Sequence, residues 1–368
     1  MAGRDGIAPD PTADLFLDEL EDHTPLPVSA AQRAVTAGLV IIPFLGLLAA
    51  VALLWGRGLT TIDLALFGAM YVMTGLGITL GYHRLFAHHS YQTVSPITTL
   101  LAIWGSMAAQ GPLLIWTAVH RRHHQHSDEA DDPHSPHGFG DGAWAVLKGA
   151  VHAHLGWMFV TPLPELERYV PDLMANKTLR WISDTFVLWV ALGLVVPGVI
   201  GGLLTQSWVG ALSGLLWGGL VRLFFVHHLT WSINSVCHIW GARDYRSRDE
   251  SRNNVIFGVL AFGEGWHNNH HAFPASARHG LRWWQFDLTY VIIRLLERVG
   301  LIWRVRVPSA DALAAKRLGG ESLAPTVHPV PTSAQETLAA PLVPPLAATV
   351  TAAVGRRAVK GRAANAAV

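Results

Sequence analysis

Charged residues and cysteines are both scarce in this chain of 368 residues. Only 14% of the residues are charged, whereas a soluble domain typically carries roughly 25%, so the composition indicates a membrane protein. The net charge of +1 gives no basis for strong attraction to nucleic acid. The single cysteine, Cys237, excludes a disulfide framework within the chain and an iron–sulfur cluster held by several thiolates.

Built-in electron carriers are missing as well. We find no His-Pro-Gly-Gly segment of the kind that binds haem in a fused cytochrome b5. Gly75 and Gly77 are not followed by the third glycine of a dinucleotide-binding fingerprint, and they lie inside an apolar run, where helix packing explains them. A redox reaction on this chain would therefore need an external electron donor.

The two ends differ in composition from the middle of the chain. The first 26 residues are acidic, unlike a secretory signal, and we expect residues 1–33 to form a mostly disordered lead. From about residue 308 the chain is rich in Ala, Pro, Val and Thr, and we expect residues 307–368 to be a disordered tail. A membrane domain is expected over residues 34–306.

Five apolar runs have about the length that a helix needs to cross a bilayer. They are Val35–Trp55, Ile62–Tyr82, Ile97–Val119, Phe186–Leu204 and Trp208–Leu229. If all five crossed, histidines after the second and third runs would lie on opposite faces of the membrane. Pro96, Gly105, Gly111 and Pro112 weaken the third run as a spanning helix. We therefore predict four transmembrane helices in a bundle, with the third run interfacial or re-entrant.

Basic residues gather in the segments that follow the histidines, while the opposite loops hold only Arg57. By the positive-inside rule the histidine face is cytoplasmic, and both termini lie on that side. The prediction is an all-α integral protein of the cell membrane, with a cytoplasmic helical cap that carries the histidines. Ala143–Met158 is expected to be an amphipathic surface helix, and Arg282–Val299 is expected to be helical.

Nine histidines lie in four groups at the ends of apolar segments. They are His83 and His88; His120, His123 and His124; His238; and His267, His270 and His271. In the second and fourth groups the spacing is i, i+3 and i+4, which places all three side chains on one face of a helix. Asn234 shares a helix face with His238. His83 and His88 are five residues apart, so they converge only where the second span ends or unwinds.

Imidazole is the commonest protein ligand for transition metals, and nine of them can supply two ions. Ligand type alone leaves zinc, copper, iron and nickel open. A structural zinc site is usually rich in cysteine, whereas this cluster has none and lies at a membrane boundary. The pattern favours a redox metal that acts on lipid. The other histidines, among them His134, His154 and His279, are interpreted as ordinary structural or surface residues.

Five segments resemble the membrane fatty-acid desaturases of the stearoyl-CoA Δ9 type and their acyl-lipid relatives. They are Gly81–His88 (GYHRLFAH), His120–His124 (HRRHH), Asp132–His134 (DPH), Asn234–His238 (NSVCH) and Glu264–Pro274 (EGWHNNHHAFP). The likeness covers about residues 34–304. It implies two iron ions, O2 as co-substrate and insertion of a cis double bond into a saturated acyl chain.

The resemblance also implies roles for individual residues. One iron would take His83, His88, His120, His124 and His271. The other would take His123, His238, His267 and His270, with Asn234 holding a water beside it. Trp231 resembles a tryptophan that lines the acyl tunnel in this family, and Phe67 and Tyr71 are candidates for closing the end of that tunnel.

One departure from the family leaves the carrier of the acyl chain open. Animal acyl-CoA desaturases have Arg-Asp directly before the second histidine group, and here those positions are Ala118 and Val119. Acyl-CoA and acyl-lipid substrates both remain possible, and the basic residues Arg84, Arg121, Arg122 and Lys148 are candidates for meeting headgroup phosphates. A ferredoxin or a reductase is the expected electron donor.

Two other functions compete with desaturation. A di-iron lipid hydroxylase or ketolase would use a similar centre, and its product would carry an added oxygen. A metal transporter or sensor is the second alternative. Transport normally needs ionisable groups at mid-membrane depth, whereas these histidines are juxtamembrane, so the enzyme is favoured.

Overall fold

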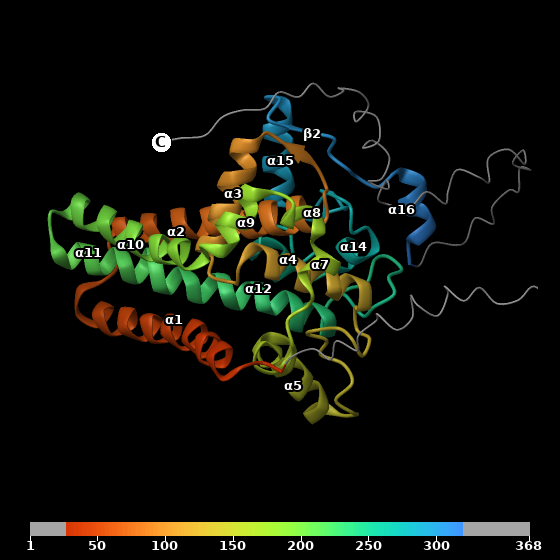
Figure 1. Ribbon diagram of the computed structural model, residues 1–368, viewed down its shortest axis with the longest axis horizontal. Coiled ribbons are helices and arrows are strands. Elements are labelled where there is room, and N and C mark those ends of the chain that lie inside the picture. Colours follow the sequence, from red (N-terminus) through yellow and green to blue (C-terminus); the bar gives the residue numbers. More distant parts are fainter. Residues whose placement is uncertain (1–26, 319–368) are drawn as a thin grey trace, which may run out of the picture. The chain divides into compact units, whose positions relative to one another are not determined.

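A computed structural model describes residues 27–318 of the chain (Figure 1). The first half contains α1 (Ala30–Arg57), α2 (Thr61–Leu76), η2 (Gly77–Ala87), β1 (Gln92–Thr93), α3 (Ser95–Met107), α4 (Leu113–His126), α5 (Ala143–Val151), η3 (His152–Gly156), α6 (Trp157–Val160), α7 (Leu166–Tyr169), α8 (Pro171–Met174) and α9 (Lys177–Asp184). The second half contains α10 (Phe186–Thr205), α11 (Trp208–Gly214), η4 (Leu215–Val221), α12 (Arg222–Ile239), α13 (Val255–Leu260), α14 (His267–Ala272), α15 (Leu288–Arg298), β2 (Ile302–Trp303) and α16 (Ala310–Lys316).

Four helices in the described part of the chain are long and apolar enough to cross a membrane. They cover Ala30–Leu53, Thr61–Ala87, Phe186–Thr205 and Trp208–Ile239. Figure 1 shows them running alongside one another, and the segment η4 contacts α1, α2 and α10. Many of their large apolar side chains face outward, as expected for surfaces that contact lipid. The prediction of an all-α membrane protein with four spans is confirmed.

The third apolar run does not form a fifth span because it is broken between α3 and α4. Ala109 and Gly111 have positive φ angles of 55° and 111°, which end the helix and reverse the chain. The last span supplies hydrogen-bond donors to the carbonyl oxygens that remain unpaired at the end of α3. Arg222 donates to Met107 O at 2.8 Å, and a hydrogen bond of 2.9 Å joins His227 Nε2 to Ala108 O.

The second span continues into a π-helical segment, η2, that carries the first histidine pair. A π-helix has hydrogen bonds from residue i+5 to residue i, and His88 N donates to His83 O at 3.1 Å. This wider turn brings His83 and His88 together although they are five residues apart. Gly77 allows η2 to touch α3, since a Cβ there would lie 2.3 Å from Gly105 N.

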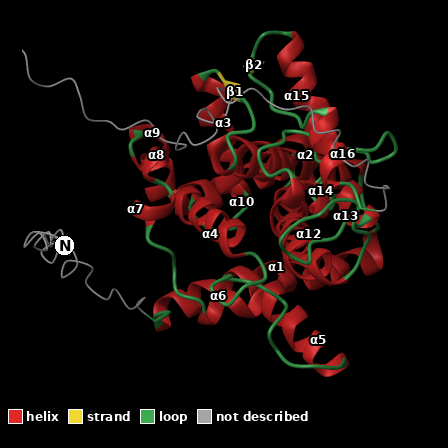
Figure 2. Ribbon diagram, turned by 90° about the vertical axis from the view of Figure 1, so that its right-hand side faces the viewer, coloured by secondary structure: helices red, strands yellow, loops and turns green. Residues whose placement is uncertain are grey.

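The surface helix expected at Ala143–Met158 is present as α5, η3 and α6. Trp144 and Val160 are 66% and 61% exposed, and both views place α5 on the opposite side of the bundle from α15 (Figures 1 and 2). The other expected helix, Arg282–Val299, begins only at Leu288, because Asp287 caps it by accepting from Tyr290 N.

Both expected domain boundaries shift toward the ends of the chain. Helix α1 begins at Ala30, inside the expected lead, and residues 1–26 lie outside the described part. The disorder expected from residue 307 was wrong for residues 310–318. There α16 is held by long-range hydrogen bonds: Arg246 N donates to Lys316 O and Leu318 N to Asp244 O. The rest of the expected tail lies outside the described residues.

Candidate metal centre

Five histidines from three parts of the chain bring their ring nitrogens together in a first cluster. Its members are His83, His88, His120, His124 and His270. Their candidate ligand atoms all lie within 4.8 Å of one another. Nε2 of His270 is 3.0 Å from Nε2 of His83 and 2.8 Å from Nε2 of His124. Helices η2, α4 and α14 together position this cluster.

Four further histidines form a second cluster: His123, His238, His267 and His271. Nε2 of His238 lies 3.0 Å from Nε2 of His267. All nine predicted histidines therefore meet in two clusters. The expected assignment of histidines to these clusters was wrong, because two of them are exchanged. His270 belongs with the first cluster and His271 with the second. Consecutive residues of a helix differ by about 100° around its axis, so the neighbouring residues His270 and His271 point to different sides.

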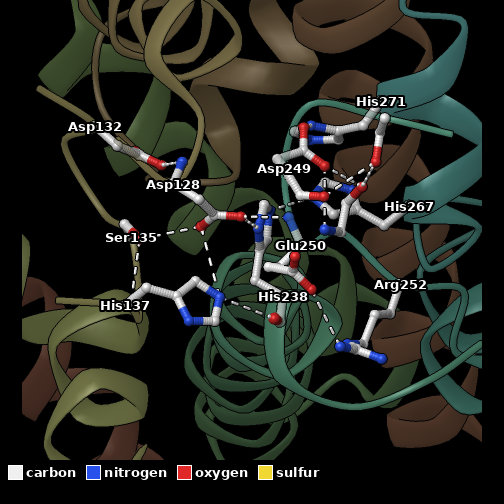
Figure 3. A network of polar contacts seen from close by, with 12 residues as sticks. Asp128, Asp132, Ser135, His137, His238, Asp249, Glu250, Arg252, His267 and His271 are labelled. Atoms are coloured by element: carbon white, nitrogen blue, oxygen red, sulfur yellow. Dashed lines mark hydrogen bonds and ion pairs between the residues drawn. The ribbon is translucent and has the colours of Figure 1, made fainter. Parts of the chain in front are cut away.

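Carboxylates stand behind the histidines of the second cluster (Figure 3). Nδ1 of His123 donates to Asp132 at 2.9 Å, and Nδ1 of His238 donates to Asp128 at the same distance. Nδ1 of His271 likewise faces Asp249 at 2.5 Å. An ionised carboxylate only accepts hydrogen bonds, so each of these rings carries its proton on Nδ1 and keeps a free electron pair on Nε2.

The first cluster has a similar support behind His83. Its Nδ1 contacts Glu264, which also accepts from Arg84 Nη2 at 3.2 Å. Arg84 is completely buried and pairs in addition with Asp287 at 3.0 Å. The cation and the two carboxylates therefore fix His83 from behind and compensate each other's charge inside the protein.

The buried ring nitrogens fit a metal ion better than they fit one another. Among the described residues, Nε2 of His123 and Nε2 of His271 are buried without a hydrogen-bond partner, which is costly unless another group meets them. Both have Nδ1 fixed on a carboxylate, so each presents a bare electron pair. Several imidazole electron pairs facing one another at about 3 Å repel unless a cation lies among them. The donor set is that of a transition metal.

The carboxylates outside the spans stay ionised, which keeps the ligand orientation fixed. Burial alone would raise the pKa of Asp128, but the hydrogen bond from His238, attraction to that ring and the hydrogen bond from the backbone N–H of Glu250 together outweigh it and hold the pKa at about 2. The pKa of Asp132 and that of Asp249 are also well below the usual range, because His123 and His271 outweigh the effect of burial.

An apolar cavity begins at the histidines and runs between the second and fourth spans. His83, His120, His123 and His267 from both clusters line it, together with Asn234. Its other walls are mainly aliphatic and aromatic: Tyr71, Ile78, Trp116, Val226, Leu229, Ile233, Leu260 and Phe262. A narrow apolar space that ends on a polar metal-binding wall suits a hydrocarbon chain.

The three residues predicted to bind substrate occupy different places. Tyr71 lines the cavity, whereas Phe67 stacks behind Tyr71 at a ring distance of 5.8 Å. Trp231 is not among the residues of the cavity wall, and its ring packs against His227 and His228. Thr230, one position earlier, does line the cavity and accepts a hydrogen bond of 2.8 Å from Gln110.

Comparison with known proteins decides the family. A family model described as fatty acid desaturase matches residues 62–305, which is more than half of the chain. The chain belongs to the fatty acid desaturase family. This desaturase is therefore an oxidoreductase that acts on fatty acyl chains.

Several curated proteins are similar over most of the chain. A hex-5-enoyl-[acyl-carrier protein] acetylenase from Moorena producens is 44% identical over 280 residues, which cover 76% of this desaturase and 87% of that protein. An sn-1 stearoyl-lipid 9-desaturase from Synechocystis sp. is 38% identical over 67% of this chain and 73% of its own length. The Δ9 acyl-lipid desaturase 1 of Arabidopsis thaliana is 39% identical over 65% and 74%.

Sequence reasoning missed several residues of the desaturase site. His279 and His134 were interpreted as ordinary histidines, yet His279 lies with His83 and Glu264, and His134 lies with His123 and Asp132. Asp132 and Glu264 stand inside the recognised segments, so their place in the motif was a usable signal. Asp128 and Asp249 gave no comparable signal, because only the fold brings them to the histidines.

The basic residues that were expected to meet headgroup phosphates differ in their surroundings. Arg84 faces inward and is fully engaged, so that expectation was wrong for it. Arg121 binds Asp172 at 2.7 Å and the carbonyl oxygen of Phe86. Lys148 is exposed and lies 5.7 Å from the ring centre of Trp144. Of these four, Lys148 is the most accessible to a headgroup.

The metal-free desaturase is expected to lose stability on acidification. Burial, followed by repulsion from neighbouring histidines, lowers the pKa of His88, His120, His124, His267 and His270, and burial lowers that of His271 to about 4. The unfolded chain has ordinary histidines with a pKa near 6.5 and binds these protons first. His123 opposes the trend, since Asp132 outweighs burial and raises its pKa.

The unfolding midpoint of metal-free protein should therefore be flat from about pH 8 to 7 and fall as the pH drops below about 6.5. Thermal unfolding in detergent over this range measures it. A midpoint that rises on acidification would contradict the burial of neutral histidines.

Proposed function

We propose that the protein is an O2-dependent fatty acyl desaturase that inserts a cis double bond at the Δ9 position, with two iron ions held by the two histidine clusters. The observation that carries the proposal is the meeting of both clusters with one end of an apolar cavity. Relatives that are named Δ9 desaturases support the position of the double bond.

The overall reaction balances with an external electron source. The chain segment –CH2–CH2– loses two hydrogens, O2 takes these together with two electrons and two protons, and two waters form. When bound, the iron supplies the activation of O2 that C–H cleavage requires. The electrons come from a ferredoxin or a reductase, since the chain has neither the cysteines of an iron–sulfur cluster nor a haem-binding segment.

The residues of the protein position the reactants. His83, His88, His120, His124 and His270 would hold one ion, and His123, His238, His267 and His271 the other. Asn234, which lines the cavity as His267 does, would hold a water. The carboxylates at Nδ1 of His83, His123, His238 and His271 would keep the Nε2 atoms of these four rings directed at the ions. Because a saturated chain has no polar group at mid-length, the shape of the cavity selects which carbons reach the centre.

The cavity wall beside the first cluster contains a polar brace. Trp116 stacks on His120 at a ring distance of 5.1 Å and donates from Nε1 to Gln110 at 3.4 Å. Gln110 in turn donates to Thr230. This chain of hydrogen bonds joins α4 to α12 at the cavity wall, and it would hold the acyl chain in a fixed path past the histidines.

Membrane orientation is part of the proposal. The basic segments lie on the histidine side of the spans, so we place this side and both termini in the cytoplasm. Reducing electron donors and newly made acyl chains are both available there. Reporter fusions in the loop between α10 and α11 and on the histidine side of the spans would test this orientation.

The proposed activity is tested by fatty-acid analysis in a desaturase-deficient bacterial host that also expresses a ferredoxin and its reductase. New monounsaturated acids with the double bond at C9 are expected from the wild-type protein. A bond elsewhere would reject the Δ9 assignment, and hydroxylated or keto acids would favour the alternative di-iron oxygenase. Metal uptake by vesicles without lipid oxidation would favour a transporter.

Shortening Tyr71 is expected to move the product profile toward longer chains. Tyr71 lines the cavity and donates to Leu260 O at 2.6 Å, so Tyr71→Ala opens the far end, whereas Phe67→Ala removes only the ring behind it. The share of products longer than the wild-type ones should rise severalfold for Tyr71→Ala and less for Phe67→Ala. Gas chromatography of the host lipids measures this, and an unchanged profile in both variants would contradict the assignment.

A further inference from the structure

The loop between α12 and α13 carries four arginines. Two of them, Arg243 and Arg252, pair with Glu250 at 3.0 Å and 3.2 Å. The other two, Arg246 and Arg248, have exposed side chains, and neither forms an ion pair with a carboxylate in the described part of the chain. The loop therefore presents two positive charges that are not neutralised.

The other carboxylates of this loop are already engaged. Asp244 accepts from Arg282 at 2.7 Å. Asp249 is buried and faces Nδ1 of His271 at 2.5 Å. Neither carboxylate is left to neutralise the two exposed arginines.

Helix α16 adds two more cations beside the loop. Lys316 and Arg317, at its end, are exposed and have no carboxylate partner among residues 27–318. The backbone joins the two segments, because Arg246 N donates to Lys316 O at 2.7 Å and Tyr245 pairs with Arg317 in an antiparallel bridge. We call the surface formed by Arg246, Arg248, Lys316 and Arg317 the cationic face.

The cationic face points away from the membrane spans. Figure 1 shows α16 beyond the C-terminal end of α12, on the opposite side from the loop between α10 and α11. Charges at this distance from the spans are badly placed to meet lipid headgroups, since attraction to a membrane surface falls off within a Debye length. A soluble partner fits this position.

The cationic face lies directly over the second histidine cluster. Arg248 is followed in the chain by Asp249, which holds the ring of His271. Nζ of Lys316 donates at 2.6 Å to the carbonyl oxygen of Ala272, the residue after His271. Both halves of the face are therefore bonded to the segment that carries a candidate metal ligand. Electron transfer slows steeply with distance, so a donor bound here would be well placed to reduce the centre.

The loop is fixed to the metal centre, so its charges are held in place. Glu250 N donates at 2.8 Å to Asp128, the carboxylate that holds His238. Arg252 N donates to the carbonyl oxygen of Cys237 at 2.6 Å. A partner therefore meets a preformed surface and pays little to order it.

We propose that the cationic face is the docking surface for a small acidic iron–sulfur protein of the ferredoxin type, which delivers electrons to the second cluster beside Asp249 and His271. The proposal rests on the proposed desaturase function, and it names the electron donor of that site and the place where it binds.

An acidic donor is the partner that the charge pattern selects. Four cations without carboxylate partners attract clustered carboxylates and steer their approach, and such steering weakens steeply as the ionic strength rises. The face spans only two adjacent segments, as is typical of weak electron-transfer complexes, which must separate after each transfer. Each donor loses one electron from its iron–sulfur cluster, so two donors supply the two electrons that the overall reaction consumes.

Zero-length cross-linking maps the docking position without any turnover. Iron-loaded full-length protein in phosphatidylcholine nanodiscs is mixed with an acidic two-iron ferredoxin and a carbodiimide, which joins a carboxylate of the ferredoxin to a lysine. Lys316 should form at least fivefold more cross-linked peptide than Lys148 or Lys177, which are exposed elsewhere. High salt should abolish the link. Links that form mainly at Lys148 or Lys177 would overturn the proposed surface.

Charge reversal measures the contribution of the two loop arginines. The test variant combines Arg246→Glu with Arg248→Glu. The matched control combines Lys177→Glu with Arg180→Glu in α9, which lies on the other side of the molecule from α16 in Figure 2 and changes the net charge equally. Affinity for oxidised ferredoxin, measured by surface plasmon resonance, should fall at least tenfold in the test variant and less than twofold in the control.

Reduction kinetics show whether docking serves electron transfer. Reduced ferredoxin should reduce the bound iron at least tenfold more slowly in the Arg246→Glu, Arg248→Glu variant than in wild type. Dithionite, which needs no docking surface, should reduce it at the wild-type rate. Iron content and thermal midpoint check that both double variants are folded.

The outcomes separate this proposal from the proposed function. Equal loss of affinity in both double variants, or none in either, overturns the docking surface and leaves desaturation standing. Reduction by a flavoprotein alone that reversal of Arg246 and Arg248 leaves unchanged also overturns it, because the electrons then enter elsewhere. If wild-type protein is cross-linked at Lys316 and its iron is reduced, but no unsaturated product forms, the docking surface stands and desaturation is rejected.

Discussion

Replacing His271 by alanine should reduce double-bond formation by more than about 100-fold. Residues behind a metal ligand typically contribute roughly 10- to 100-fold to affinity or activity, and His271 would be a ligand itself. Its Nε2 is buried and has no hydrogen-bond partner among the described residues, while its Nδ1 is held by Asp249. Asp249→Asn keeps the ring but weakens its orientation, so its loss should be smaller, within that 10- to 100-fold range.

Iron analysis of double variants tests the division into two clusters. His267 and His271 lie in the same cluster, so the variant with both replaced by alanine should keep about one iron per chain. The variant with both His270 and His271 replaced damages both clusters and should lose nearly all its iron. The division first expected, with His267 and His270 together, predicts instead that both variants damage both clusters and lose nearly all their iron. His152→Ala, outside both clusters, is the matched control.

The spacing within the helices contains the rule that the first division overlooked. With 3.6 residues per turn, positions i and i+4 differ by about 40° around a helix, and i and i+3 differ by about 60°. In α4 the i, i+4 pair His120 and His124 shares the first cluster, and in α14 the pair His267 and His271 shares the second. Applied to both helices, this rule gives the two i, i+4 pairs from the sequence alone, whereas the fold decides which other histidines join each pair.

The spans and the meeting of the nine histidines follow from local signals that a sequence displays directly: run length, glycine and proline breaks, and helical spacing. The buried residues that hold the histidines in place do not follow from such local signals. Arg84 stands beside a histidine at a membrane boundary, where a cation normally faces headgroups, yet it is buried against Glu264 and Asp287. Only the packing of η2 against the start of α15 reveals this.

The end of the domain also could not be predicted from composition, for a physical reason. Composition measures how well a segment forms a core by itself, and residues 310–318 form none. Their order comes from partners far away in the chain, such as the contact of Lys316 Nζ with Ala272 O at 2.6 Å and the pairing of Arg317 with Tyr245. A composition-based boundary therefore ends the domain too early.

Replacing Arg84 by methionine should destabilise the protein by about 3–5 kcal/mol, the cost of removing one partner from a buried ion pair. The guanidinium is 0% exposed and serves Glu264, Asp287 and the carbonyl oxygen of Ala277 together. Without it, two carboxylates are left in the interior with one cation fewer. We expect the thermal midpoint to fall by several degrees and iron to be lost, because Glu264 also holds His83.

Two further variants show whether this effect comes from burial and geometry. Arg294 pairs with Glu297 on the surface, where its side chain is 49% exposed, and Arg294→Gln should change stability by no more than about 1 kcal/mol. Arg84→Lys keeps the charge but loses the planar fork that reaches several acceptors, so it should recover part of the stability and less of the iron. If Arg84→Met were as stable as Arg294→Gln and kept its iron, the buried network would not be what orients His83.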